Sequence, residues 1–136
     1  MKYILMMNGT KADFDWYATW PKQELRAHTA FMHAFNKELK DSGAFVAAEG
    51  LAFPNEARIV RAGGDGQPIT DGVFPEAKEF LAGYWIVDVE GPEEAYRLAA
   101  RASGAPHPVR PGAAGALGNQ PIEVRRVLAA PPDEWQ

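Results

Sequence analysis

Residues 71–79 (DGVFPEAKE) lie between two stretches with the composition of β-strands. An ordinary connection needs the Asp-Gly pair or the proline, but it does not need two carboxylates and a lysine directly afterwards. Upstream, residues 57–62 and 67–70 are predicted to be strands that the turn at residues 63–66 (GGDG) joins into a hairpin. Downstream, residues 84–89 (YWIVDV) are predicted to form a strand that is apolar on both faces over most of its length. The segment is therefore predicted to connect a hairpin to a buried strand.

The remaining elements complete an α+β pattern. Residues 3–7 (YILMM), 44–51 and 122–128 are predicted to be strands, and the first of these is again apolar on both faces. Residues 21–42 are predicted to form an amphipathic helix that a proline begins and a glycine ends, and residues 92–102 to form a second helix. The order β-α-β, hairpin, β-α-β indicates a ferredoxin-like split βαβ fold, an antiparallel sheet with two helices on one face.

Domain organisation and oligomeric state are predicted from the same pattern. A chain of 136 residues fits one domain, which we assign to residues 1–128, followed by a Pro-rich tail at residues 129–136. Residues 103–120 form a long loop rich in Gly, Ala and Pro, a type of loop that is often functional or mobile. Two helices cover one face of a sheet, yet two strands are apolar on both faces. We therefore expect a homodimer in which two sheets pack face to face.

Composition excludes several classes of partner and chemistry. The net charge is −4 and basic residues are not concentrated, so no nucleic-acid partner is expected. The absence of cysteine excludes disulfides, thiolate catalysis and cysteine zinc sites. The apolar run at residues 2–7 is too short for a membrane span or a signal peptide, so no membrane partner and a cytoplasmic location are expected. The three histidines show no metal-ligand spacing on an inward face, so neither a metal nor a cofactor is expected.

Two residues are candidates for acid–base chemistry. His28 lies within the apolar stripe of the first predicted helix, whereas His33 lies on its polar side. Such a histidine is either a hydrogen-bonded core residue or a proton carrier near neutral pH. Asp71 either closes its own turn or orients an imidazole at the mouth of a pocket, and its two oxygens allow both roles. His28 and Asp71 are therefore the candidate catalytic pair.

Four further residues are candidate ligand contacts. Glu76 and Lys78 are either part of a solvated face or contacts to a ligand, and they share a face only if the segment is extended. Trp85 and Phe31 offer large apolar surfaces, and the alternative role for them is the core or a dimer interface.

Aromatic residues and a histidine also occur in predicted loops. Trp16, Tyr17 and Trp20 precede the first predicted helix in a polar loop, where three aromatic residues indicate a lid or an interface. His107 lies between two prolines in the long loop and is expected to be an exposed loop residue.

The segment at residues 71–79 resembles the Asp-Gly-Pro-Phe motif of the YCII-related proteins. Residues 26–31 and 49–51 also resemble patterns of that family, and the resemblance covers residues 2–102 and the last strand. Two features depart from the family: proline follows phenylalanine at residues 73–75 (VFP), which alters the turn, and the 103–120 loop is longer. The clearest matches are Asp71, Gly72, Phe74, Glu76, Lys78, Glu79, Gly83 and Tyr84.

The resemblance implies a dimeric α+β barrel. Function in the family is mostly unassigned; some relatives resemble small lyases or isomerases in which a His–Asp pair moves protons on cyclic or hydroxylated aromatic compounds. We therefore expect a YCII-like protein that performs cofactor-free proton transfer on a small organic molecule through His28 and Asp71. The alternatives are a small-ligand-binding or regulatory module without turnover, and a purely structural dimerisation domain.

Overall fold

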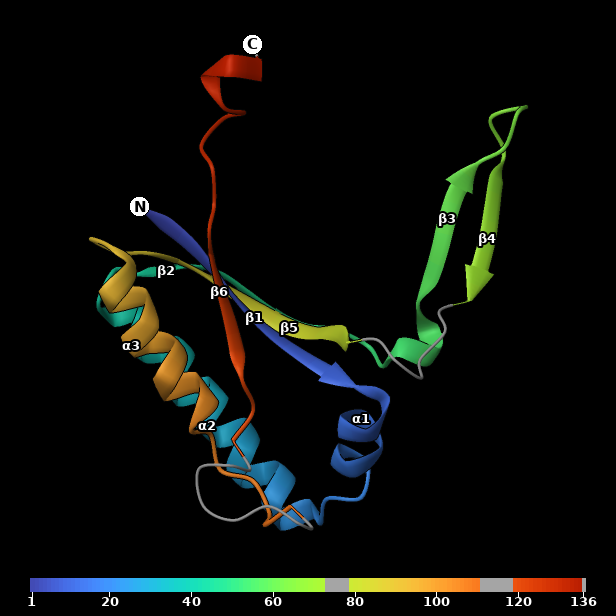
Figure 1. The fold of residues 1–136 in the computed structure, drawn as a ribbon. Coiled ribbons are helices and arrows are strands. Elements are labelled where there is room, and N and C mark those ends of the chain that lie inside the picture. Colours follow the sequence, from blue (N-terminus) through green and yellow to red (C-terminus); the bar gives the residue numbers. More distant parts are fainter. Residues whose placement is uncertain (73–78, 111–118, 136) are drawn as a thin grey trace.

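The computed structural model describes residues 1–72, 79–110 and 119–135 (Figure 1). The strands and α-helices within these ranges are β1 (Lys2–Thr10), α1 (Lys11–Tyr17), α2 (Lys22–Asp41), β2 (Phe45–Gly50), β3 (Arg58–Ala62), β4 (Pro68–Gly72), β5 (Glu79–Asp88), α3 (Pro92–Ser103) and β6 (Ile122–Arg126). None of the helices within these ranges has the length and apolar content needed to cross a membrane.

Four strands form one antiparallel sheet in the order β2-β5-β1-β6. Helices α2 and α3 lie side by side on one face of this sheet (Figure 1). Strand β1 therefore lies between β5 and β6, and the first βαβ unit interlocks with the second, as in a ferredoxin-like fold. The predicted fold class is confirmed.

The core lies between the sheet and the two helices. Leu5 is opposite Trp85 on β5 and opposite Val124 on β6, so these three side chains share the face that the helices cover. Phe35 of α2 contacts Trp85 edge-on, with ring centroids 5.6 Å apart. Four side chains are almost fully buried: Phe35, Leu39, Leu5 and Val87. The apolar stripe of α2 predicted this burial for Phe35 and Leu39. Burial of these side chains fixes α2 on the sheet.

The opposite face of the sheet is apolar as well. Ile4 is opposite Ile86, and Met6 is opposite Tyr84, so all four side chains lie on that face. Each of them remains partly exposed. Among the described elements, no helix covers this face (Figure 1). The predicted sheet-to-sheet dimer would cover it, and the dimer stays a prediction.

Strands β3 and β4 form a separate two-stranded sheet, which confirms the predicted hairpin. We call this hairpin, residues 58–72, the arm. Every residue of both strands is exposed. Figure 1 shows the arm leaving the end of the sheet near α1 and extending to the side away from α2 and α3. The arm therefore contributes little to the core of its own chain.

Helix α1 differs from the prediction, which placed Trp16 and Tyr17 in a loop. Thr10 Oγ1 accepts a hydrogen bond from the Asp13 N–H at 3.2 Å, and Asp13 Oδ2 accepts one from the Thr10 N–H at 2.8 Å. This reciprocal capping box satisfies two free N–H groups at the start of the helix. The Thr10-x-x-Asp13 spacing is the sequence pattern that indicates this helix start, although a capping box usually has Glu or Gln in place of the aspartate.

Candidate ligand pocket

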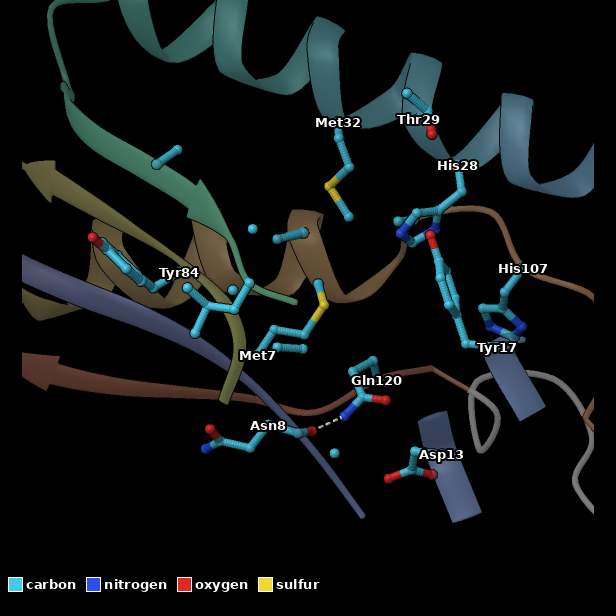
Figure 2. A pocket seen from close by; sticks show the side chains of 18 of the residues that line it. Met7, Asn8, Asp13, Tyr17, His28, Thr29, Met32, Tyr84, His107 and Gln120 are labelled. Atoms are coloured by element: carbon cyan, nitrogen blue, oxygen red, sulfur yellow. Dashed lines mark hydrogen bonds between the residues drawn. The ribbon is translucent and has the colours of Figure 1, made fainter. Parts of the chain in front are cut away.

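A pocket of about 500 Å³ lies between the sheet and α2, and α1 closes one of its ends (Figure 2). In Figure 2 the side chains of Met32 and His28 extend from α2 toward Met7 of β1, and Tyr17 and His107 border the same space. A pocket of this volume with mainly apolar walls is typical of a site for a small organic molecule.

Aromatic residues form the wall next to α1. Phe14 contacts Phe53 edge-on at 5.4 Å between ring centroids, and Trp16 contacts Trp20 in the same way at 5.1 Å. Trp20 lies after α1, in the turn that leads to α2, and its side chain is 8% exposed. The capping box at Thr10 therefore matters for the pocket, because it fixes the start of α1, and α1 carries Phe14 and Trp16 of this wall.

A close approach of two strands forms another part of the wall. A Cβ atom at Gly83 of β5 would lie 2.9 Å from the carbonyl oxygen of Glu49 on β2. A side chain at this position would displace backbone, so glycine is required where these strands meet. Both residues line the pocket.

His28 has one ring nitrogen fixed by the protein. Its Nδ1 lies 3.0 Å from the carbonyl oxygen of Pro106, which follows α3. A carbonyl oxygen only accepts, so Nδ1 donates, and in a neutral imidazole Nε2 is then the proton acceptor. The rings of Trp20 and Tyr17 contact His28 edge-on, with centroids 5.2 Å and 6.2 Å away. The predicted inward orientation of His28 is confirmed, because His28 lines the pocket.

His107 was expected to be an exposed loop residue, and this expectation is wrong. It is half-buried and lines the pocket. Its Nδ1 lies 2.6 Å from the carbonyl oxygen of Pro108, and its Nε2 lies 2.9 Å from Asn119 Oδ1. The sequence contained no local signal for this, because the contact to Asn119 depends on how the loop folds back.

Asp13 and Arg110 tie the loop to α1. Arg110 Nη1 donates to Asp13 Oδ1, and the Arg110 guanidinium also lies over the Trp16 ring, 5.1 Å from its centroid. Burial raises the pKa of Asp13, but the hydrogen bonds from Thr10 and Arg110 outweigh burial and hold this pKa below its ordinary value. Gln120 is fixed nearby because its amide donates to the carbonyl oxygen of Asn8 (Figure 2).

Two tryptophan N–H groups near the pocket differ in their partners. Trp85 Nε1 donates to Asn36 Oδ1 at 2.7 Å, so this predicted contact residue is fixed in a buried position on the pocket wall. Trp20 Nε1 is the one buried side-chain N or O atom without a hydrogen-bond partner among the described residues. Phe31 packs against the core and stacks on Phe35 at 6.2 Å, and it is not among the pocket-lining residues.

The structure does not bring Asp71 into this pocket. Asp71 lies at the C-terminal part of β4 in the arm, where Arg61 Nη2 donates to its Oδ2 at 3.0 Å. It is exposed and absent from the pocket wall of its own chain. Glu76 and Lys78 lie outside the described residues. Within the described parts of the chain, no group of three or more His, Asp or Glu residues could hold a metal ion.

A comparison with known protein families matches most of this chain. The family model of the YCII-related domain matches residues 1–107, which include strands β1 to β5, helices α1, α2 and α3, and the pocket residues His28 and His107. A comparison with curated proteins gave no match to this chain.

Proposed function

This chain belongs to the YCII-related family, and we propose that its pocket binds a small, mainly apolar organic molecule from which His28 accepts a proton. The hydrogen bond between His28 Nδ1 and the Pro106 carbonyl carries this proposal. It orients the ring and assigns the acceptor role to Nε2, as a general base requires. The reaction class is proton transfer of the kind that an isomerase or a lyase performs, and the base itself requires no cofactor.

The Trp20 indole supports a ligand with a hydrogen-bond acceptor. A buried N–H without a partner costs about 1–3 kcal/mol relative to a satisfied one. Trp20 lines the pocket and contacts the His28 ring. A ligand oxygen that reached this N–H after a small shift of the indole would remove that cost. We therefore favour a ligand with a carbonyl, carboxylate or hydroxyl oxygen.

The orienting group for His28 in its own chain is the Pro106 carbonyl, and this changes the proposed role of Asp71. A carboxylate at Asp71 acts on the pocket only if the arm of another subunit carries it there. Glu76 and Lys78 stay proposed ligand contacts on the basis of the sequence, and Phe31 supports the pocket through Phe35. Trp85 is the proposed contact with a direct place on the pocket wall.

We further propose that the protein is a homodimer formed through the open face of the sheet. The apolar side chains on that face support this, since Ile4, Ile86, Met6 and Tyr84 have no covering element among the described residues. Two such faces packed together would bury them as the two inner faces of a sandwich do.

A second candidate function is ligand binding without turnover. One observation favours it: in the described part of the chain, His28 makes no ion pair and its single hydrogen bond is to a backbone carbonyl. Elimination or isomerisation usually needs both an acid and a base, so one histidine must then serve both steps.

Deuterium exchange distinguishes the two functions without knowledge of the natural substrate. A library of small cyclic and aromatic ketones, acids and phenols is first screened by ligand-observed NMR. Each binder is then incubated with the protein in D2O, and loss of C–H signals next to carbonyl groups is followed. The proposal expects exchange with the wild type and at least a hundredfold slower exchange with His28→Asn, with binding largely retained.

The matched control is Arg26→Asn, which also introduces asparagine on α2 but at an exposed position that does not line the pocket, so exchange should not change. Binding without exchange in the wild type would establish the non-catalytic function. If no compound of the library binds in a way that substitution of a pocket residue weakens, both functions are contradicted.

A further inference from the structure

We infer that the arm seats on the pocket rim of a second copy of this chain, so that each pocket is completed by its partner. We call Leu51 and Phe53 the rim, because both residues line the pocket and both are exposed, at 46% and 38%. This inference rests on the proposed homodimer but concerns a different surface. It assigns an occupant to the open side of the pocket.

Among the described residues, five of the eleven exposed large apolar side chains lie in the arm and the rim. Ile59, Val60 and Ile69 of the arm are 42%, 58% and 53% exposed. A two-stranded hairpin alone is at best marginally stable in water, and it needs a third layer to cover an apolar face. Because the described part of its own chain does not provide this layer, the arm has the properties of a segment that packs on another molecule.

Strand register defines the packing face of the arm. Ile59 is opposite Asp71 and Arg61 is opposite Ile69, so these four side chains share one face. The ion pair between Arg61 and Asp71 crosses this face between the two isoleucines. The face therefore combines two apolar contacts with a fixed carboxylate, and a partner that binds the isoleucines also receives Asp71.

Direction and area favour a second copy as the occupant. The arm extends to the side of the sheet away from α2 and α3, which is where the proposed dimer places the partner (Figure 1). Four strands about 4.8 Å apart and five to ten residues long give an open face of roughly 480 Å². An interface of standard size buries about 800 Å² per partner, so the sheet face alone falls short of that size. The arm and the rim would supply the additional area.

Two-fold symmetry makes the contact reciprocal. In an isologous dimer, the arm of each copy meets the rim of the other, and both contacts form together. The exposed isoleucines then cover Leu51 and Phe53, and the open side of each pocket is closed. Each arm brings its Asp71 to the rim of the other copy. The carboxylate of one subunit would then reach the pocket that contains His28 of the other subunit.

Disulfide cross-linking tests this contact directly, because the chain contains no cysteine. One preparation carries Ile69→Cys with an affinity tag, and an untagged preparation carries Phe53→Cys. The two are mixed, allowed to exchange subunits and oxidised. The inference expects a tagged–untagged cross-linked dimer with a yield at least tenfold above that of a control mixture of Ile69→Cys and Tyr96→Cys. Tyr96 is a suitable control because it is 57% exposed on α3, outside the arm and the rim.

Equal yields in the two mixtures, with a dimer observed by sedimentation, would overturn the arm contact and leave the sheet-face dimer intact. A wild-type chain that is monomeric at high micromolar concentration would overturn both. Neither result affects the proposed binding and proton transfer in the pocket, which the exchange experiment tests separately.

A second variant measures the contribution of the contact. The double substitution Ile59→Ser and Ile69→Ser is expected to raise the dimer Kd about 100-fold, because each removes apolar area from the interface. The far-UV and near-UV circular dichroism should stay unchanged, since the arm lies outside the core. An effect no larger than that of Tyr96→Ser would contradict the inference.

Discussion

Strand β5 and the arm contain similar apolar residues but bury them to different extents. Trp85 and Val87 of β5 are covered by α2 and α3 and are almost fully buried, whereas Ile59 and Ile69 of the arm are exposed. Apolar sequence alone therefore does not determine burial; the element that covers it does. The core holds the pocket, and the arm carries Asp71, so the two halves of the predicted His28–Asp71 pair lie in regions with different physical roles.

The largest difference between the two regions should appear on truncation of a core side chain. Phe35→Ala removes a ring that packs on Trp85 and Phe31, and it is expected to lower the free energy of unfolding by about 3–5 kcal/mol. Urea denaturation measures this loss. A loss below about 1 kcal/mol would show that the sheet–helix layer is not the stable part of the molecule.

A smaller loss is expected from Asn36→Ala. Trp85 Nε1 donates to Asn36 Oδ1, and removal of the acceptor leaves this indole N–H without a partner in the core. The expected loss is about 1–3 kcal/mol in urea denaturation, because a buried donor is unsatisfied. Asn36→Asp retains an acceptor oxygen and serves as the comparison. Equal stability of Asn36→Ala and the wild type would contradict the role of this hydrogen bond.

The ion pair at Asp13 should give a pH-dependent effect. Its pKa in the folded chain lies below the ordinary value of 3.8, so its ionised form stabilises the fold. This contribution is present above about pH 5 and is lost as the pH falls through the folded-state pKa. We expect Asp13→Asn to cost about 1 kcal/mol at pH 7.

The difference between Asp13→Asn and the wild type should shrink as the pH falls below the ordinary value of 3.8, and it should disappear once the pH is below the folded-state pKa. Thermal denaturation across this range measures it. A difference that stays constant with pH would show that Asp13 acts through shape and not through charge.

The smallest effect on folding is expected from Val60→Ala in the arm. This side chain is exposed in the free subunit, so the free energy of unfolding of the monomer should change by less than about 0.5 kcal/mol. The measurement is made at a concentration at which sedimentation detects only monomer. A loss comparable to that of Phe35→Ala would mean that the arm belongs to the core of its own chain.

The fold was largely predictable because it depends on local patterns. The apolar stripe of α2 placed Phe35 and Leu39 in the core, and the turn at residues 63–66 identified the hairpin. The site was less predictable because it depends on distant contacts. Arg110 pairs with Asp13, a residue 97 positions away in the chain, and no periodic pattern signals such a pair.

His28 shows how much of the site the sequence can predict. Periodicity placed it on the inward side of α2, and the pocket contains it. The partner of its Nδ1 is a backbone carbonyl 78 residues away, and a carbonyl is present at every position of the sequence. The sequence instead singled out Asp71 as the partner, because a carboxylate beside a tight turn is a visible signal, whereas a main-chain acceptor is not.

The state of the His28 ring is the most direct test of the proposed function. Long-range ¹H–¹⁵N correlation spectra of histidine-labelled protein should resolve three imidazole rings, and His28→Asn identifies the signals of His28. We predict that neutral His28 carries its proton on Nδ1 and that Nε2 is unprotonated. A neutral His28 ring with its proton on Nε2 would contradict the Pro106 hydrogen bond and the role of His28 as the proton acceptor of the pocket.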